Sequence, residues 1–302
     1  MLLVLLVSLF TFGQTDVTQY YLENAGFDSN YDYTATQNKA VAQEIKTIDG
    51  WTAGHNLNYT IAGVYQLGFL GTYNSAKVPS KGYDEETTGG GLALSTGWGN
   101  EFPYYQTVTL PKGTYTISVP TYNGKNVAAG TSLLAWIPNS GDAVKSNVAE
   151  YPVEKWVLDK ITFTLSKPTT GKIQIGYKAA AGGSANSCNI FIDYVKIVGE
   201  NMVLDKADLK TLIDEANNLY DDGKGVGATE YKNIIDEAQV VYDNKDATVM
   251  EILDVEKRLK EKTESFHQEN VSEKHPIDFT SSLTNPSFET NNLTGWNNTN
   301  MK

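Results

Sequence analysis

The sequence predicts a multidomain chain of the β-then-α class, in which an antiparallel β-sandwich is followed by a three-helix bundle and by the start of a second β-sandwich. Three observations predict this order. Residues 16–199 carry many short runs of alternating apolar and polar residues, residues 203–269 follow a helical period, and residues 276–302 repeat a motif from the beginning of the chain. A length of 302 residues also fits about two domains of roughly 100 to 200 residues each.

The runs in the first region have the period of antiparallel strands. In "TYTISV" at 114–119, Tyr115, Ile117 and Val119 share one face, and the three hydroxyl residues between them share the other. Similar runs lie at 104–110, 133–137, 161–165, 172–177 and 190–198. Many short strands without helical periods between them predict a β-sandwich or jelly roll over residues 16–199.

The period changes to that of amphipathic helices after residue 203. One helical face is formed by Leu209, Leu212, Ile213, Ala216, Leu219 and Tyr220, and residues 231–242 repeat that spacing. Three glycines in "DDGKGVGA" at 221–228 end the first helix. A third helix is expected to begin after Thr248, because Thr248 and Glu251 have the spacing of a capping box. Three short helices joined by brief turns predict an antiparallel bundle.

The N-terminal run "MLLVLLVSLFTFG" predicts a signal peptide at residues 1–13 that is cleaved after Gly13. The run is shorter than the about 20 residues that a membrane-spanning helix needs, so no membrane insertion is expected after its removal. The alternative is a buried N-terminal strand. From the predicted signal peptide we expect a secreted protein, extracellular or at the cell surface, with the periplasm as the alternative location. The net charge of −12 disfavours nucleic acid as a partner.

No convincing catalytic set stands out in the sequence. The three histidines, at positions 55, 267 and 275, are scattered, and nothing marks one carboxylate pair among the 36 acidic residues. The residues present therefore predict no enzyme. A glycoside hydrolase domain beyond the C-terminus remains an alternative.

One motif occurs twice. "LENAGFD" at 22–28 and "LTNPSFE" at 283–289 share residues at the same offsets, and each is followed by a Gly-Trp pair, at 50–51 and 295–296. A β-sandwich needs about 100 residues. We therefore expect that residues 276–302 are the incomplete start of a second sandwich, and that the natural polypeptide continues or the sequence is truncated.

The motif resembles the first strand of bacterial carbohydrate-binding modules with the galactose-binding-like jelly roll. "YYQTVTLPKGTYTISV" at 104–119 and "IFIDYVKI" at 190–197 also match that pattern, in the same order. The resemblance spans most of residues 16–199, and the long insert between Asp28 and Trp51 departs from it. It implies noncatalytic binding of a polysaccharide or oligosaccharide.

The closing run 190–198 contains one carboxylate that calls for a partner. On strand periodicity, Asp193 shares a face with Phe191, Val195 and Ile197, where an unpartnered carboxylate is costly. The resemblance implies that Asp193 joins Asp28 in a structural calcium site, and oxygen ligands suit that cation. The alternative is that Asp193 accepts hydrogen bonds from backbone amides without a metal.

Aromatic residues in or beside loops are the candidates for stacking on sugar rings. Tyr65, Trp98, Tyr104 and Tyr122 are the candidate ligand-binding residues, and Tyr65 and Trp98 are the two for which exposure is expected. For Trp51 and Trp136 we expect core positions instead.

The helical region, 203–269, resembles the FIVAR domain of large bacterial surface proteins. The resemblance rests on "DKADLKTLIDEANNL", a turn, a second helix of like phase, and "DATVMEILDVEKRLKEK". It implies a spacer. Two functional classes follow for the whole chain: a glycan-binding region linked to polysaccharide processing, or a cell-surface adhesion scaffold with protein partners.

Overall fold

A computed structural model describes residues 14–28, 48–54, 61–67, 72–73, 76–96, 99–124, 130–179, 188–220 and 223–277. The chain divides into two compact units between Leu204 and Asp205. The predicted signal peptide, Trp98, and the repeated motif at 283–289 lie outside the described residues.

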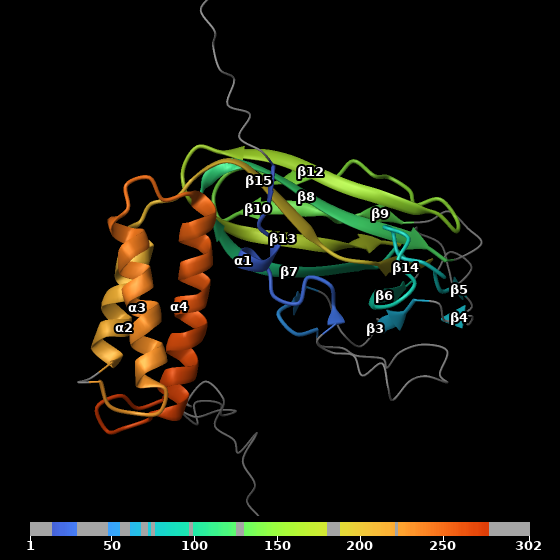
Figure 1. Cartoon of the computed structure of the whole chain (residues 1–302). Coiled ribbons are helices and arrows are strands. Elements are labelled where there is room, and N and C mark those ends of the chain that lie inside the picture. Colours follow the sequence, from blue (N-terminus) through green and yellow to red (C-terminus); the bar gives the residue numbers. More distant parts are fainter. Residues whose placement is uncertain are drawn as a thin grey trace, which may run out of the picture. The chain divides into compact units, whose positions relative to one another are not determined.

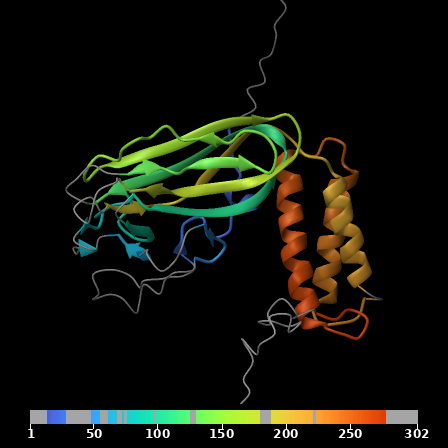
Figure 2. The same ribbon diagram turned by 180° about the vertical axis from the view of Figure 1, so that it is seen from behind.

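The first unit contains two antiparallel sheets that lie face to face (Figures 1 and 2). The seven-stranded sheet runs β1 (Thr15–Asp16), β15 (Lys196–Val203), β8 (Lys112–Asn123), β14 (Cys188–Ile192), β6 (Gly90–Thr96) and β3 (Ile61–Gln66), and β12 (Trp156–Leu165) also pairs with β8. Ile117 of β8 pairs with both Ile161 and Ile197, so β12 and β15 lie on opposite sides of β8.

The six-stranded sheet runs β11 (Val144–Lys145), β10 (Ala135–Pro138), β13 (Thr169–Lys178), β7 (Glu101–Leu110) and β2 (Thr52–Ala53), and β9 (Thr131–Ser132) also pairs with β13. A separate pair joins β4 (Thr72–Tyr73) to β5 (Ala76–Lys77). The short helix α1 (Thr18–Tyr21) follows β1 and contacts β15 and β7.

The core of the first unit lies between the two sheets. Trp136 of β10 stacks on Phe163 of β12, with ring centroids 5.1 Å apart and an interplanar angle of 4°. Tyr115 and Ile117 of β8 are fully buried, and Phe163 also stacks on Tyr115. The predicted β-sandwich and the predicted core position of Trp136 are therefore confirmed.

Trp51 packs against residues of the segment 22–28, as the sequence predicts. Trp51 is 5% exposed, and its ring centroid lies 5.7 Å from that of Phe27. Its indole Nε1 donates a hydrogen bond of 3.2 Å to the carbonyl of Asn24. The expected core position of Trp51 is confirmed.

The closing run does not form one strand. β14 ends at Ile192, which pairs with Thr121, and β15 begins at Lys196, which pairs with Ser118, so the closing run has one residue more than the stretch of β8 opposite it. The Asp193 amide still donates to the carbonyl of Pro120 on β8, whereas the Val195 amide donates to that of Ala25. Phe191 pairs with Tyr122, and Ile197 with Ile117. Since positions 122 and 117 of β8 face opposite ways, the shared face predicted for Phe191, Asp193, Val195 and Ile197 is wrong.

The second unit contains α2 (Ala207–Leu219), α3 (Ala228–Asp243) and α4 (Val249–Glu269), and each helix contacts the other two. Its buried side chains include Leu209, Ile213, Tyr231, Ile235, Leu259 and Phe266. The predicted capping box is present: the amide of Glu251 donates to Oγ1 of Thr248, and the amide of Thr248 donates to the carboxylate of Glu251. Among the helices that the structure describes, none has the length and apolarity to cross a membrane.

Candidate functional site

A covering segment, residues 76–90, crosses the outer face of the seven-stranded sheet, the face turned away from the other sheet (Figure 1). We call this segment the strap. The amide of Lys77 donates to the carbonyl of Gly124, and the carbonyl of Lys81 accepts a 3.0 Å hydrogen bond from the indole of Trp156. These hydrogen bonds therefore hold the strap to the chain just after β8 and to the first residue of β12.

An apolar cluster lies on this outer face. It consists of Tyr65, Leu67, Val78, Ala93 and Phe191, all buried. Tyr65 contacts Phe191 edge-on, with centroids 5.1 Å apart, and Val78 of the strap belongs to the same cluster. Tyr65 is 0% exposed, so the exposure predicted for it is wrong. Its ring faces away from the other sheet, as a ligand-binding ring would, but it is buried within this cluster.

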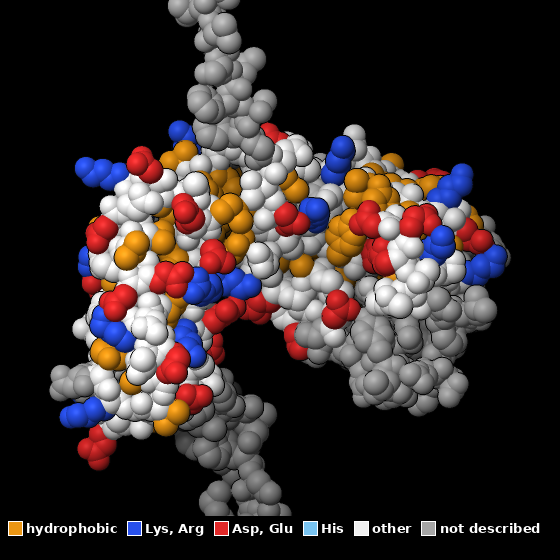
Figure 3. Space-filling model, in the orientation of Figure 1, with side chains coloured by type: hydrophobic (Ala, Val, Ile, Leu, Met, Phe, Trp, Pro, Cys, Tyr) orange, Lys and Arg blue, Asp and Glu red, His pale blue; other side chains and the backbone are white. Residues whose placement is uncertain are grey.

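Two aromatic rings lie at the border of this cluster, where burial is only partial. Tyr122 of β8 and Trp156 of β12 are opposite each other in the ladder, with ring centroids 5.3 Å apart. Leu158, two residues along β12 on the same face, is 37% exposed. We call Tyr122, Trp156 and Leu158 the aromatic platform. Figure 3 shows hydrophobic side chains gathered over this end of β8 and β12, beside charged ones.

Polar groups flank the aromatic platform. Nζ of Lys77 lies 2.8 Å from Oε1 of Glu154, and the amide of Glu154 donates to the carbonyl of Asn123, the residue after Tyr122. Burial, with a smaller contribution from the charge of Glu154, raises the pKa of Tyr122, so its phenol stays neutral. An ammonium and a carboxylate therefore lie within reach of a ligand stacked on these rings.

The sequence identified one of the two rings. Tyr122 was a predicted ligand-binding residue and is partly exposed. Trp156 was missed, although alternation along β12 signals it: Ile161 and Phe163 point into the core, so Trp156 and Leu158 point outward.

Tyr104 points inward between the two sheets, whereas its predicted role in ligand binding requires an outward position. It is 0% exposed between the sheets, because burial along β7 alternates and places Phe102, Tyr104 and Gln106 inward. A surface role for Tyr104 is therefore wrong. Its neighbour Tyr105 points outward and is partly buried, with Nζ of Lys172 4.0 Å from its ring centroid. The strand period would have selected Tyr105.

Asp193 is 4% exposed, and its contacts come from the strap. Its Oδ2 accepts a 2.8 Å hydrogen bond from the amide of Tyr83, as the metal-free alternative expects. Burial raises the pKa of Asp193 to about 7; the Tyr83 amide opposes this, and a hydrogen bond with Glu86 and the charge of Asp84 add to it. At mildly acidic pH the carboxyl group of Asp193 is therefore protonated.

The two predicted calcium ligands differ in exposure. Asp28 is exposed, whereas Asp193 is buried beneath the strap. Within the described ranges, no group of three acidic, histidine or cysteine side chains is arranged to hold a metal ion. The donor set at Asp193 and Glu86 is oxygen alone, which suits calcium, but two carboxyl groups do not complete its usual shell of six to eight oxygen ligands. Calcium binding stays a prediction.

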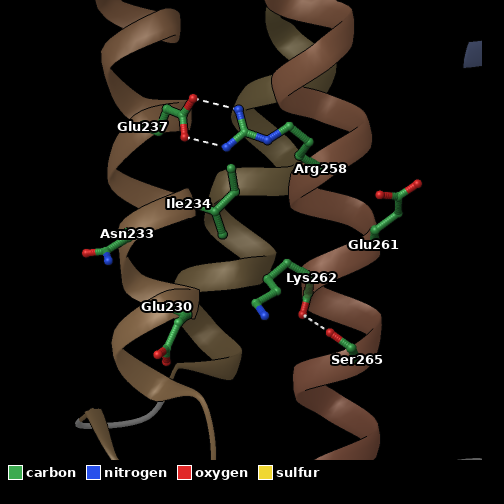
Figure 4. A pocket seen from close by; sticks show the side chains of 8 residues that line it. All are labelled: Glu230, Asn233, Ile234, Glu237, Arg258, Glu261, Lys262 and Ser265. Carbon is green, nitrogen blue, oxygen red and sulfur yellow. Dashed lines mark hydrogen bonds and ion pairs between the residues drawn. The ribbon is translucent and has the colours of Figure 1, made fainter.

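A groove on the second unit lies between α3 and α4 (Figure 4). Arg258 donates two hydrogen bonds to Glu237, of 2.6 and 2.7 Å, across the groove. The other charged lining residues are Glu230, Glu261 and Lys262, and no aromatic ring lines the groove. This exposed ion pair joins two helices and contributes at most about 1 kcal/mol.

Comparisons with known proteins give similarity in structure only. No protein-family model matches the sequence, and no curated protein matches it. One similar solved structure is TmCBM61 in complex with β-1,4-galactotriose, with 19% identity, a TM-score of 0.36, and coverage of 60% of this chain and 98% of that one.

Two further similar structures are a cyclase and a xylan-binding domain. A cyclase from Fischerella sp. TAU has 14% identity and a TM-score of 0.43, with 64% of this chain and 100% of that one covered. A xylan-binding domain from CBM 22 has 15% identity and a TM-score of 0.32, with 55% of this chain and 99% of that one covered. Because the scores and identities are this low, the similarities assign neither a ligand nor an activity to this chain.

Proposed function

We propose that the first unit binds a polysaccharide or oligosaccharide, without catalysis, through the aromatic platform. The observation that carries this proposal is that Tyr122 and Trp156 form one partly exposed pair of rings on the outer face of a sheet. Aromatic rings in such a position expose an apolar surface that the core does not use.

The chemistry of the platform fits an uncharged sugar. The apolar face of a pyranose ring stacks on an indole or phenol ring, and its hydroxyl groups bond to the ammonium of Lys77 and the carboxylate of Glu154. An anionic polymer fits less well, because the whole chain carries a net charge of −12. Stacking on two rings leaves little free energy after the ordering costs, so the expected Kd is roughly micromolar to millimolar.

Affinity electrophoresis and calorimetry on the complete chain test this proposal. The probes are a glycan array, β-1,4-galactan, because one similar structure holds β-1,4-galactotriose, and xylan, because another is a xylan-binding domain. Trp156→Ala should weaken binding by about tenfold or more, whereas Trp156→Phe, which keeps a ring, should retain most of it.

The matched control is Tyr105→Ala, which removes a partly exposed ring from the other sheet and should leave binding unchanged. Binding that is insensitive to Trp156→Ala would remove the platform from the proposal. Binding to a protein partner with no glycan retained would favour the adhesion scaffold.

For the second unit we propose a spacer role within an exported multimodular protein, as the FIVAR resemblance implies. Support comes from its core, which contains buried residues of all three helices, α2, α3 and α4. Deleting residues 205–277 should leave the Kd for glycan unchanged. A changed Kd would assign the helices a part in binding. N-terminal sequencing of the protein recovered from the medium tests export and the cleavage after Gly13.

A further inference from the structure

A hollow in the surface of the first unit lies beside α1, away from the rings of the platform. Segments distant in the sequence meet here: β1, α1, the loop after α1, the strap, and the start of β15. The side chains that line it and matter for recognition are Asp16, Thr18, Asp84, Tyr194 and Lys196, and Gly26 leaves one wall without a side chain.

One side of the hollow holds an ionised carboxylate within a network of donors. Oδ1 of Asp16 accepts hydrogen bonds from the amide and the hydroxyl of Thr18, at 3.0 and 2.7 Å. Nζ of Lys196 lies 3.3 Å from Oδ2 of Asp16. Partial burial would raise the pKa of Asp16, but these donors lower it overall, so the carboxylate is charged at neutral pH.

Another part of the lining presents an aromatic ring with a second carboxylate. The phenol of Tyr194 donates a 2.8 Å hydrogen bond to Oδ2 of Asp84. Burial and this carboxylate raise the pKa of Tyr194, so the phenol stays neutral and the bond keeps its direction. Tyr194 is partly buried and Asp84 is exposed, so both are accessible from solvent.

The mixture of groups selects the class of ligand. An anion would meet the carboxylates of Asp16 and Asp84, and a cation would meet the ammonium of Lys196. A neutral ligand with several hydroxyl groups can donate to both carboxylates, accept from Lys196, and place a C–H face on the ring of Tyr194. An adjoining hollow shares Asp16 and Thr18 and extends past Gln19 and Leu22, which leaves room beyond one ring.

We propose that this hollow is a second carbohydrate site, which takes one neutral sugar ring or a polyol, independently of the aromatic platform. The proposal shares only the ligand class with the proposed function. The strap links the two sites, since Lys81 bonds to Trp156 and Asp84 bonds to Tyr194. A polymer long enough to engage both sites would bind more tightly than either site alone, because its second contact is intramolecular.

The test is an NMR titration of the complete, ¹⁵N-labelled chain with free galactose, glucose and xylose, one at a time. We expect saturable shifts at the amides of Gly26, Tyr194 and Lys196 with a Kd of roughly 1 to 50 mM for at least one sugar. Asp84→Asn and Lys196→Met should each weaken this binding by about fivefold or more. Lys145→Met, which removes an exposed lysine of the other sheet, should not.

The result distinguishes the two sites. Shifts at the hollow that persist in Trp156→Ala support this inference even if the platform binds nothing. No saturable shift at the hollow, or shifts unaffected by Asp84→Asn and Lys196→Met, overturn it, and the indole signal of Trp156, followed with an oligosaccharide, reports the platform separately. The spectrum of each variant also shows whether it is folded.

Discussion

Tyr122 and Trp156 lie directly opposite each other on β8 and β12, with ring centroids 5.3 Å apart and an interplanar angle of 54°. Tyr122 also contacts Phe191, at 6.2 Å between centroids, so the pair extends a buried aromatic cluster to the surface. The packing of Tyr122 on buried Phe191 therefore holds the platform in place for a ligand that stacks on it.

The first prediction concerns the coupling between these two rings. In a double-mutant cycle with Tyr122→Ala and Trp156→Ala, the free energies of unfolding should be non-additive by about 0.5 to 1.5 kcal/mol, the usual worth of an aromatic pair. Denaturant unfolding of the two single variants and the double variant measures this. Additive effects would mean that the rings are neighbours without a net interaction.

The second prediction concerns Trp51. Because its ring is buried against Phe27 and its indole bonds to Asn24, Trp51→Ala should destabilise the first unit by about 3 to 5 kcal/mol. Calorimetric unfolding measures this, with Tyr105→Ala as the control, for which a loss below about 1 kcal/mol is expected. A loss for Trp51→Ala no larger than that of the control would contradict its core role.

Local periodicity accounts for what the sequence predicted correctly. Alternation along 114–119 and 161–165 gave the core faces of β8 and β12, and the Thr248 and Glu251 spacing gave the cap of α4. The same alternation, applied to 104–110, would have separated buried Tyr104 from outward Tyr105. Nearness to a loop therefore does not predict the exposure of an aromatic residue here, whereas strand parity does.

Contacts between segments that are distant in the sequence account for the features that periodicity did not predict. Tyr65 has outward parity and is buried in the cluster that Val78 of the strap shares, and periodicity does not reveal such a cover. Asp16, Asp84 and Lys196 meet only because distant segments fold together. The parity of the closing run changes because it has one residue more between Ile192 and Lys196 than β8 has opposite it, and the Val195 amide there bonds to the distant Ala25.

The third prediction concerns the cap of α4. Thr248→Ala removes the acceptor for the amide of Glu251 and should destabilise the helical unit by about 1 kcal/mol. Thr248→Ser keeps the hydroxyl and should cost less. Thermal unfolding followed by circular dichroism at the helix band measures both. Equal melting curves for wild type and Thr248→Ala would show that the capping box does not stabilise the helix.

The fourth prediction concerns pH and Glu256, which is largely buried on α4. Burial raises its pKa; the charge of Lys260 opposes this, and that of Asp208 adds to it. Since the folded-state pKa lies above the unfolded value, the protonated form stabilises the fold. That stability is present below the unfolded pKa and is lost as pH rises through the folded pKa.

The contribution of Glu256 to the stability of the helical unit should therefore fall as pH rises from about 4 toward neutrality, and Glu256→Gln, which stays neutral, should remove that contribution from the slope of stability against pH. The matched control is Glu264→Gln, at an exposed position of the same helix, which should leave the slope unchanged. Circular dichroism melts at several pH values measure the slopes. An unchanged slope in Glu256→Gln would assign the dependence to other groups.

The last prediction concerns calcium and Asp193. The pKa of Asp193 is raised to about 7 by burial and by Glu86, so the stability that its proton supplies is present at low pH and is lost as pH rises through about 7. Calcium binds the ionised carboxylates and would replace that proton. If calcium binds here, millimolar calcium should raise the Tm of the first unit more at pH 8 than at pH 5.5, and a chelator should reverse the gain.

Two variants decide which carboxylates take part. Asp193→Asn should abolish the response to calcium and also remove the loss of stability with rising pH, because the amide does not ionise. Asp28→Asn should weaken the response only if Asp28 completes the shell, as the sequence resemblance implies. If chelation leaves the wild-type Tm unchanged at pH 8, where Asp193 is ionised and a cation would gain most, then Asp193 serves the fold through the Tyr83 amide and Glu86 alone.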